Sequence, residues 1–311
     1  MKVWINGQFF EDTEAKISVF DAGFQHSVGL FETMVAKNGG LFRGEEHLDR
    51  LCKSATELRL TETLCKEPLL EALNLTLTEN EQKNARLRLT ITGGDLNLLQ
   101  SAGKTKHSDP TIVIQSQPLT EYPGAFFEKG TFVSLASGRI NPYELGAGHK
   151  TLNYWPKLLN LQLAAMYKCG EAIWLTPGAN ITGGCVSNVF TVKDNLLQTP
   201  IARGEEASED GPSATLPGIT RLTIIEIAEQ MGLGVRKCPL TLDDLLEADE
   251  VFLTNSSWGI LPVVGVRAIT QEAEKPGIQE QSIGESKVGE ISKSLLSTYN
   301  QTVEEETKKN A

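Results

Sequence analysis

The chain has 311 residues, of which 40% are apolar and 22% charged, and its formal net charge is −11 at pH 7. A chain of this length can bury a substantial core and fits two domains of ordinary size. The negative charge disfavours attraction to nucleic acid and to anionic membranes, so we expect neither as a partner. An anionic ligand then has to be held by local arginines and backbone amides.

The sequence carries no membrane or export signal of the common kinds. No run reaches the roughly eighteen apolar residues of a membrane helix, and Met1 to Phe10 lacks the pattern of a signal peptide. We therefore expect a cytoplasmic protein. Its cysteines form no Cys-x-x-Cys pair and have no histidine at ligand spacing, so we expect reduced thiols and no metal site. They are Cys52, Cys65, Cys169, Cys185 and Cys238.

The first part of the chain is predicted to contain a hairpin and an amphipathic helix. Val3 to Phe10 alternates around Asn6-Gly7, the strongest short hairpin signal. Apolar residues at helical spacing between Glu45 and Leu60 predict a helix, and Arg50 lies off its apolar stripe. The stripe consists of Leu48, Leu51, Cys52, Ala55 and Leu58.

A strictly alternating segment, Arg86 to Thr92, predicts a strand. Its aliphatic side chains share one face, and Arg86, Arg88 and Thr90 share the other. Two arginines on one strand face form a candidate anion-binding surface.

Polar stretches containing glycine and proline, at 93–110 and 117–124, flank a predicted strand at 111–115 and place a domain boundary near residue 120. The elements expected beyond it alternate between strands and helices, which indicates a mixed α/β domain over 121–296. The strands are 131–136, 172–176, 188–192, 195–198 and 250–254, and the helices are 154–168, 219–231 and a short one after Thr241, capped by Asp244. Charged stretches without periodicity at 203–215 and 297–311 are expected to be mobile.

Lys150 lies where a Gly-rich loop, Arg139 to His149, leads into a predicted helix near Tyr154. A lysine amine attacks an aldehyde only when it is unprotonated, and burial or neighbouring cations lower its pKa. The start of a buried helix can provide that setting. Taken alone, a lysine in such a place is more often a solvated surface residue.

Seven short motifs, in order along the chain, resemble those of the fold-type-IV pyridoxal-phosphate enzymes. This family includes branched-chain aminotransferases, D-amino-acid aminotransferases and 4-amino-4-deoxychorismate lyases. The resemblance implies a two-domain, mixed α/β D-amino-acid-aminotransferase-like fold, with a smaller domain at 1–120 and a larger cofactor-binding domain at 121–296. It also implies a homodimer acting on a small amino-group substrate. The motifs are 19–26, 29–33, 47–51, 149–154, 187–190, 216–221 and 248–256.

The resemblance implies that Lys150 is the catalytic residue and holds pyridoxal 5'-phosphate covalently through its amine. The turn Leu216-Pro217-Gly218 opens a helix whose free amides and positive dipole end suit a phosphate. Arg50 resembles the family arginine that grips the same phosphate. The cofactor contacts implied are Arg50, Lys150, Tyr154, Ile219, Thr220 and Ser256.

One position departs from the family. A glutamate that the family places beside the pyridine nitrogen is replaced here by Gly183, in the stretch Ile181 to Asn188. A glycine cannot keep that nitrogen protonated, so the cofactor ring would withdraw electrons less strongly. Transamination depends on that withdrawal more than the elimination of a good leaving group does.

The sequence therefore leaves three functions open. The first is aminodeoxychorismate lyase, which eliminates pyruvate and gives 4-aminobenzoate for folate synthesis. Its substrate bears two carboxylates, for which Arg86 and Arg88 are candidate ligands. The second is an aminotransferase of D-amino or branched-chain amino acids, and the third is a homologue without catalytic activity.

Overall fold

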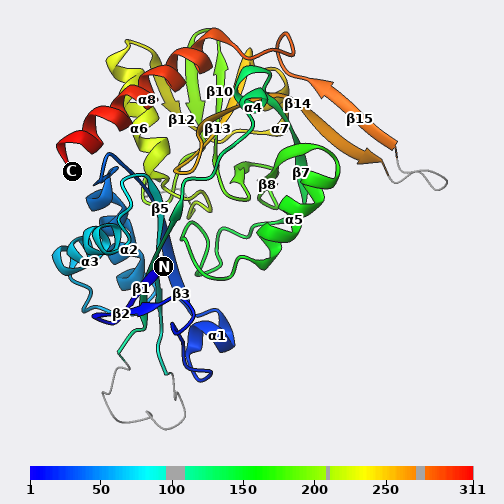
Figure 1. The fold of residues 1–311 in the computed structure, drawn as a ribbon. Coiled ribbons are helices and arrows are strands. Elements are labelled where there is room, and N and C mark those ends of the chain that lie inside the picture. The colour runs from blue at the N-terminus through cyan, green and yellow to red at the C-terminus, as the bar shows by residue number, and fades with distance from the viewer. Residues whose placement is uncertain (96–108, 208–210, 271–276, 311) are drawn as a thin grey trace. The chain divides into compact units, whose positions relative to one another are not determined.

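The computed structural model describes residues 1–95, 109–207, 211–270 and 277–310 (Figure 1). Most of the polar stretch at 93–110 and residues 208–210 of the stretch at 203–215 lie outside them. The chain divides into two compact units. Unit 1 comprises Met1–Thr120, His149–Asn153 and Thr302–Ala311, and unit 2 comprises Glu121–Gly148 and Tyr154–Gln301.

Unit 1 is built on a six-stranded sheet with the order β2-β1-β6-β5-β3-β4. The predicted hairpin is confirmed, since β1 and β2 pair antiparallel. Asn6 and Gly7 both have positive φ, 44° and 92°, which matches the twist of a tight hairpin turn. The strands are β1 Lys2–Ile5, β2 Gln8–Glu11, β3 Gly29–Lys37, β4 Gly40–Leu41, β5 Ala85–Thr92 and β6 Ile112–Pro118.

Helices α2 (Gly44–Glu57) and α3 (Lys66–Glu79) pack on one face of this sheet (Figure 1). Their apolar residues form one core with the aliphatic side chains of β5, which are fully buried as the alternating pattern predicts. The other face of β5 carries Arg86, Arg88 and Thr90. Helix α1 (Ala22–His26) is a short turn capped by Asp21. The pattern of α3 was not identified in the sequence.

Unit 2 is built on a nine-stranded sheet with the order β12-β11-β10-β13-β14-β7-β8-β9, in which β15 also pairs with β14. Pairs β7/β8, β7/β14 and β11/β12 are parallel and the others antiparallel, so the sheet is mixed. The strands are β7 Thr131–Arg139, β8 Cys169–Leu175, β9 Ile181–Gly184, β10 Asn188–Lys193, β11 Leu196–Thr199, β12 Gly234–Lys237, β13 Glu250–Asn255, β14 Gly259–Thr270 and β15 Gly277–Ser282.

The predicted helices of this part are confirmed as α5 (Trp155–Met166), α6 (Ile219–Gln230) and α7 (Leu242–Leu246). The capping box of Thr241 and Asp244 at the start of α7 is also present. A further short helix, α4, spans Gly124–Glu128. Within the described residues, none of the helices has the length and apolar character needed to cross a bilayer.

The last stretch of the chain is helical, whereas the sequence pattern predicted a mobile tail at 297–311. Helix α8 (Glu290–Lys309) buries Leu295, Tyr299 and Val303, which repeat every four residues. Charged residues between them hide this stripe in the sequence. Near its end, Glu306 forms a double ion pair with Arg43, at 2.8 and 2.9 Å.

The acidic stretch at 203–215, also expected to be mobile, is tied down by its own carboxylates where the structure describes it. Glu205 pairs with the buried Arg221, at 2.7 Å. Glu206 accepts hydrogen bonds from the backbone amides of Gly204 and Ser213. Acidic residues that indicate disorder by composition are here the hydrogen-bond acceptors that order the loop.

Candidate active site

Lys150 is carried by a short segment of unit 1 that extends the sheet at the edge of β3. The amide of Phe31 donates to the carbonyl of Lys150, and the amide of Leu152 to the carbonyl of Gly29, both at 3.0 Å. A Cβ on Gly29 would collide with the carbonyl oxygen of Ile91 on β5 and lie 2.7 Å from a methyl carbon of Leu152. Glycine at this position therefore allows β5 and the lysine segment to approach β3 closely.

The side chains of this segment alternate between the two faces of the sheet. His149 lies on the helix side, where its Nδ1 is 3.0 Å from the Oγ of Ser54 in α2. Lys150 lies on the other side, with its Nζ 4.4 Å from the ring centroid of Phe31. The guanidinium carbon of Arg88 is 3.8 Å from the same centroid. The amine of Lys150 and the guanidinium of Arg88, a group that can bind a carboxylate, both lie against the ring of Phe31. One small molecule could contact both groups.

Arg50 belongs to a buried cluster with Glu32 and His47. Its Nε donates to one oxygen of Glu32 at 2.8 Å and its Nη2 to the other, and Nδ1 of His47 lies 2.7 Å from that second oxygen. Burial raises the pKa of Glu32, but the charges and hydrogen bonds of Arg50 and His47 outweigh it and lower that pKa to about 2. Burial also lowers the pKa of His47.

The cluster fixes how Arg50 is held. Its side chain is only 9% exposed, so it is not an ordinary solvated arginine of the helix surface. The carboxylate of Glu32 orients the guanidinium by two hydrogen bonds. The sequence pattern did not identify Glu32 or His47. The signal that could have identified Glu32 is its position: it lies between Leu30 and Met34, which are two apolar residues of the buried face of β3. An acid on that face needs a partner.

In unit 2 the start of α6 has the features of an anion site. Its N-cap is Gly218, and no side chain caps its first amides. The side chain of Asn188 donates to the carbonyl of Leu216 at 2.8 Å and so fixes the turn that leads into the helix. Ile219 and Thr220 are both buried there. Uncapped amides, a positive dipole end and a hydroxyl suit a phosphate group.

Ser256 follows β13 in a turn that Asn255 organises. The side-chain oxygen of Asn255 accepts from the amides of Ser257 and Trp258, at 2.8 and 3.0 Å. Buried at either end of this turn are the Oγ1 of Thr254 and the Nε1 of Trp258, for which the described residues provide no hydrogen-bond partner. Buried polar atoms normally have a partner, so these two atoms are available to a polar group bound beside Ser256.

The turn that follows Gly183, a residue of β9, is built around a different buried acid. Gly183 has φ of 141°, and a Cβ on it would lie 2.7 Å from the carbonyl oxygen of Ser187. Beneath the turn, Glu171 accepts from four donors at 3.0–3.1 Å. Burial raises the pKa of Glu171. Its hydrogen bonds engage this carboxylate in holding the turn. Its donors are the amides of Ala172, Cys185 and Val186 and the hydroxyl of Ser187.

Tyr154 precedes α5, with the Nζ of Lys157 located 5.1 Å from its ring centroid. Lys157 was not identified in the sequence. It lies four residues before Leu161, which packs against the core that includes Cys185. Burial lowers the pKa of the Lys157 amine, against the opposing charges of Cys185 and Glu171.

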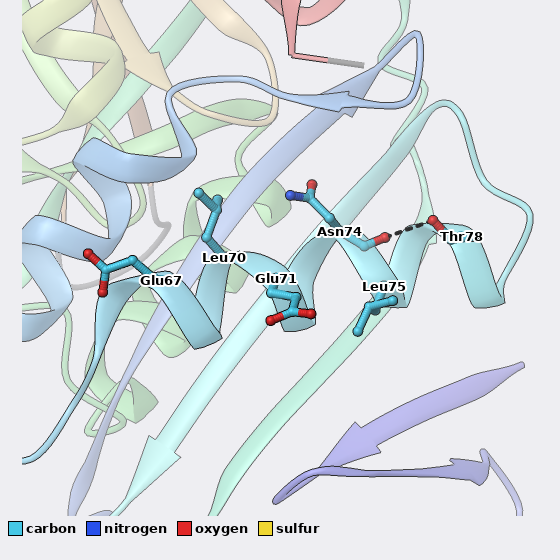
Figure 2. Close-up of a pocket in the computed structure, with 6 residues that line it drawn as sticks. All are labelled: Glu67, Leu70, Glu71, Asn74, Leu75 and Thr78. Carbon is cyan, nitrogen blue, oxygen red and sulfur yellow. Dashed lines mark hydrogen bonds between the residues drawn. The ribbon is translucent and has the colours of Figure 1, made fainter.

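Two hollows on unit 1 differ in what they can bind. A shallow one of about 420 Å³ runs along α3, where Figure 2 shows Glu67 and Glu71 beside Leu70 and Leu75. It contains no cation and none of the predicted site residues. A smaller pocket of about 120 Å³ lies on the opposite face of the sheet and includes Arg86 and Arg88 in its wall.

The predicted site residues divide between the units. Unit 1 contains Arg50, Arg86, Arg88 and Lys150, and unit 2 contains Tyr154, Ile219, Thr220 and Ser256. Two α/β units with this arrangement of sheets have the fold of the type-IV pyridoxal-phosphate enzymes. The branched-chain amino acid aminotransferase of Escherichia coli superposes with a TM-score of 0.82 at 27% identity, covering 96% of this chain and 93% of that one.

The chain belongs to the amino-transferase class IV family, whose model matches residues 29–266. Enzymes of this family use pyridoxal phosphate. A putative branched-chain-amino-acid aminotransferase of Methanocaldococcus jannaschii is 34% identical over 302 residues, covering 96% of this chain and 95% of the relative.

Relatives with other reactions are similar to a comparable degree. A D-alanine aminotransferase of Listeria monocytogenes is 30% identical over 284 residues, covering 89% of this chain and 91% of the relative. An aminodeoxychorismate lyase of Bacillus subtilis is 30% identical over 271 residues, covering 86% of this chain and 87% of the relative. Overall similarity therefore identifies the family and does not separate transamination from elimination.

Proposed function

We propose that this chain is a pyridoxal-phosphate enzyme that catalyses elimination of the aminodeoxychorismate-lyase type. The observation that carries the proposal is the backbone at Gly183. Its φ of 141° and the nearby carbonyl of Ser187 disfavour a side chain at this position, including the carboxylate that the family has there. The only acid beneath the turn, among the described residues, already accepts four hydrogen bonds.

The residues present fit the cofactor. Lys150 offers an amine beside an aromatic ring, and the start of α6 offers uncapped amides with the hydroxyl of Thr220. Ser256 lies in the turn flanked by unsatisfied buried polar atoms. Arg50 offers a further cation, oriented by Glu32. When bound, pyridoxal phosphate withdraws electrons from the carbon next to the substrate amine.

The chain's own residues supply the remaining steps. The Nζ of Lys150 would hold the cofactor and, once displaced by the substrate amine, take the proton from the neighbouring carbon. Arg88, beside the same ring, would bind a substrate carboxylate and orient that carbon toward Lys150. Without an acid at position 183 the cofactor ring is a weaker electron sink, which favours a substrate whose leaving group departs with aromatisation.

A second candidate is transamination, favoured by the 34% identity to a putative branched-chain aminotransferase and the 30% identity to D-alanine aminotransferases. The two reactions are separated by incubating the purified holoenzyme with aminodeoxychorismate and, in parallel, with an amino acid and 2-oxoglutarate. We expect pyruvate release in the first and slow amino transfer in the second. Rapid amino transfer without pyruvate release would make the chain an aminotransferase.

Lys150→Ala serves as the control for both reactions. It should abolish the visible absorbance of lysine-bound cofactor and all turnover, while far-ultraviolet circular dichroism stays unchanged. Lys157→Ala tests a second lysine, whose pKa burial lowers. If the absorbance persists in Lys150→Ala and disappears in Lys157→Ala, the cofactor is attached to the second lysine instead.

We also propose that the protein forms a homodimer. Exposed apolar side chains gather before and within α1, where Val19, Phe20 and Phe24 are 62%, 65% and 74% exposed. Clusters of exposed aromatic residues are typical of protein interfaces. Sedimentation at micromolar concentration should give a dimer, and a stable monomer would contradict it.

A further inference from the structure

His149 directly precedes Lys150 in the chain, and its side chain has two partners on α2. Its Nδ1 lies 3.0 Å from the Oγ of Ser54, and its Nε2 lies 3.5 Å from a carboxylate oxygen of Glu57. The imidazole is only 3% exposed, so it is buried against the helix. The cofactor contacts described above do not include any of these three side chains.

The two partners of His149 lie on the same side of α2 as Arg50. Positions 50, 54 and 57 are separated by four and three residues, the spacing at which side chains of one helix are neighbours. One side of α2 therefore carries the candidate phosphate arginine and also holds the residue that precedes Lys150. The contacts of His149 thus relate the position of Lys150 to that of Arg50.

The backbone of the lysine segment is joined to the edge of β3 by hydrogen bonds at Lys150 and Leu152. The chain enters unit 1 at His149, directly after Gly148, whose φ is 75°. Glycine adopts many backbone conformations, so it does not by itself fix the direction of the residues that follow. A short pairing at a sheet edge opens at a low free-energy cost unless side chains also hold it.

The side chain of His149 provides such a hold and also determines where Lys150 points. Successive side chains of an extended segment lie on opposite faces. Because His149 is held on the helix side, Lys150 is directed to the other side, where its Nζ lies 4.4 Å from the ring centroid of Phe31. Ser54 is itself buried, so its hydroxyl serves to hold the segment and is not open to a substrate.

We propose that His149 is a positioning residue, which holds the Lys150 amine where it can bond to the cofactor. This rests on the proposed function, because it takes Lys150 to be the cofactor lysine. In the bonding step the neutral amine adds to the aldehyde carbon, its two protons leave with the aldehyde oxygen as water, and a carbon–nitrogen double bond remains. Such a step is slowed by a displacement of the attacking group of about 1 Å.

Two probes added to the full-length protein freed of cofactor test this role. Pyridoxal 5'-phosphate bonds to the lysine, and the rate at which the visible absorbance of lysine-bound cofactor appears depends on where the amine lies. Pyridoxamine 5'-phosphate has an amine in place of the aldehyde, so its affinity depends only on the other contacts. His149→Phe should slow the attachment of pyridoxal 5'-phosphate by about 10- to 100-fold. The affinity for pyridoxamine 5'-phosphate should not change.

Three further variants separate positioning from a general structural role. In His149→Asn the side-chain amide can bond to the Ser54 hydroxyl in place of Nδ1, so most of the lost rate should return. Ser54→Ala leaves the lysine segment unaltered and should also slow attachment, and it decides the question if His149→Phe does not fold. Thr56→Ala removes an exposed hydroxyl from the same helix and should alter neither probe. Equal losses for both probes, or an unchanged attachment rate, would overturn the proposal.

Both measurements precede the addition of substrate, so they do not depend on whether the enzyme catalyses elimination or transamination. Lys150→Ala distinguishes failure of this proposal from failure of the lysine assignment. If Lys150→Ala loses the absorbance while His149→Phe attaches the cofactor at the wild-type rate, the positioning role is refuted and Lys150 remains the cofactor lysine. Absorbance that persists in Lys150→Ala would refute the assignment of Lys150, and with it the role of His149.

Discussion

Where the structure describes the chain, each unit buries one glutamate almost completely, and the two carboxylates have different partners. Glu32 in unit 1 is 1% exposed and is paired with Arg50 and His47. Glu171 in unit 2 is 0% exposed, and among the described residues it accepts from backbone amides and a hydroxyl but forms no ion pair. Burial raises the pKa of both, yet only the pKa of Glu32 ends below its ordinary value.

The difference shows what a cation adds to hydrogen bonding. Four donors satisfy Glu171 as an acceptor but do not offset the loss of water around its charge. Two charge-assisted bonds from Arg50 do offset it at Glu32. Glu32 therefore holds a candidate cofactor residue in place electrostatically, and Glu171 supports the turn that follows Gly183.

Glu32→Gln should have the largest effect. It leaves the guanidinium of Arg50 buried without its counter-ion, which costs about 3–5 kcal/mol of unfolding free energy. Urea denaturation measures this loss of unfolding free energy. The matched control is Glu229→Gln, at an exposed position on α6, for which little change is expected. A loss no greater than in the control would show that Arg50 does not depend on Glu32.

Acid titration of the wild type tests the same pair by another route. A folded-state pKa of about 2 means that the stabilisation by Glu32 is fully present above the unfolded pKa and is lost as the pH falls through 2. Up to about 3 kcal/mol should disappear between roughly pH 4.5 and 2. Glu32→Gln should lack this component. The raised pKa of Glu171 acts with the opposite sign, decreasing stability as the pH rises above about 4.3.

Glu171→Gln should cost less, about 2 kcal/mol. The amide nitrogen of glutamine cannot accept the hydrogen bonds that the amide of Val186 and the hydroxyl of Ser187 donate to one oxygen. Because no cation is left unpaired, the variant should be more stable than Glu32→Gln. The reverse order would mean that hydrogen bonds to Glu171 outweigh the ion pair of Glu32.

Gly183→Ala should have the smallest effect, about 1–2 kcal/mol, from its positive φ and the approach of the Ser187 carbonyl. Gly178→Ala is the control, because its Cβ would meet no atom closer than 3.7 Å. Gly183→Glu, which the family pattern suggests as a way to restore transamination, has the same backbone strain. If Gly183→Glu is as stable as the wild type and transaminates faster, the turn can adopt the family conformation.

The sequence predicted the parts of this site that depend on local patterns. The alternation from Arg86 to Thr92 predicted which side chains lie on each face of β5. The apolar stripe of α2 predicted that Arg50 lies outside that stripe. The position of Lys150 came from its motif. Strand β14 was not identified, because Pro262 and Gly265 interrupt its pattern.

The remaining features depend on neighbours that are distant in the sequence. Glu32 and His47 can be recognised as site residues only through their contacts with Arg50. Arg50 and His47 lie on α2, and Glu32 lies on β3. Nothing local in the stretch from Ile181 to Asn188 indicates that Glu171 lies beneath it. The arrangement of Arg86 with Gln117 likewise requires the register of β5 with β6. Periodicity gives the face of an element but not its partner.

The addition of the lysine segment to the edge of β3 has a consequence for folding order. Gly29 and Phe31 are bonded to residues about 120 positions later in the chain, so the sheet of unit 1 can form before Lys150 arrives. Newly made chains would then pass through a stage with a formed sheet and without the Lys150 amine beside Phe31. Pulse-labelling hydrogen exchange would detect it as late protection of the amides of Phe31 and Leu152, after those of β5.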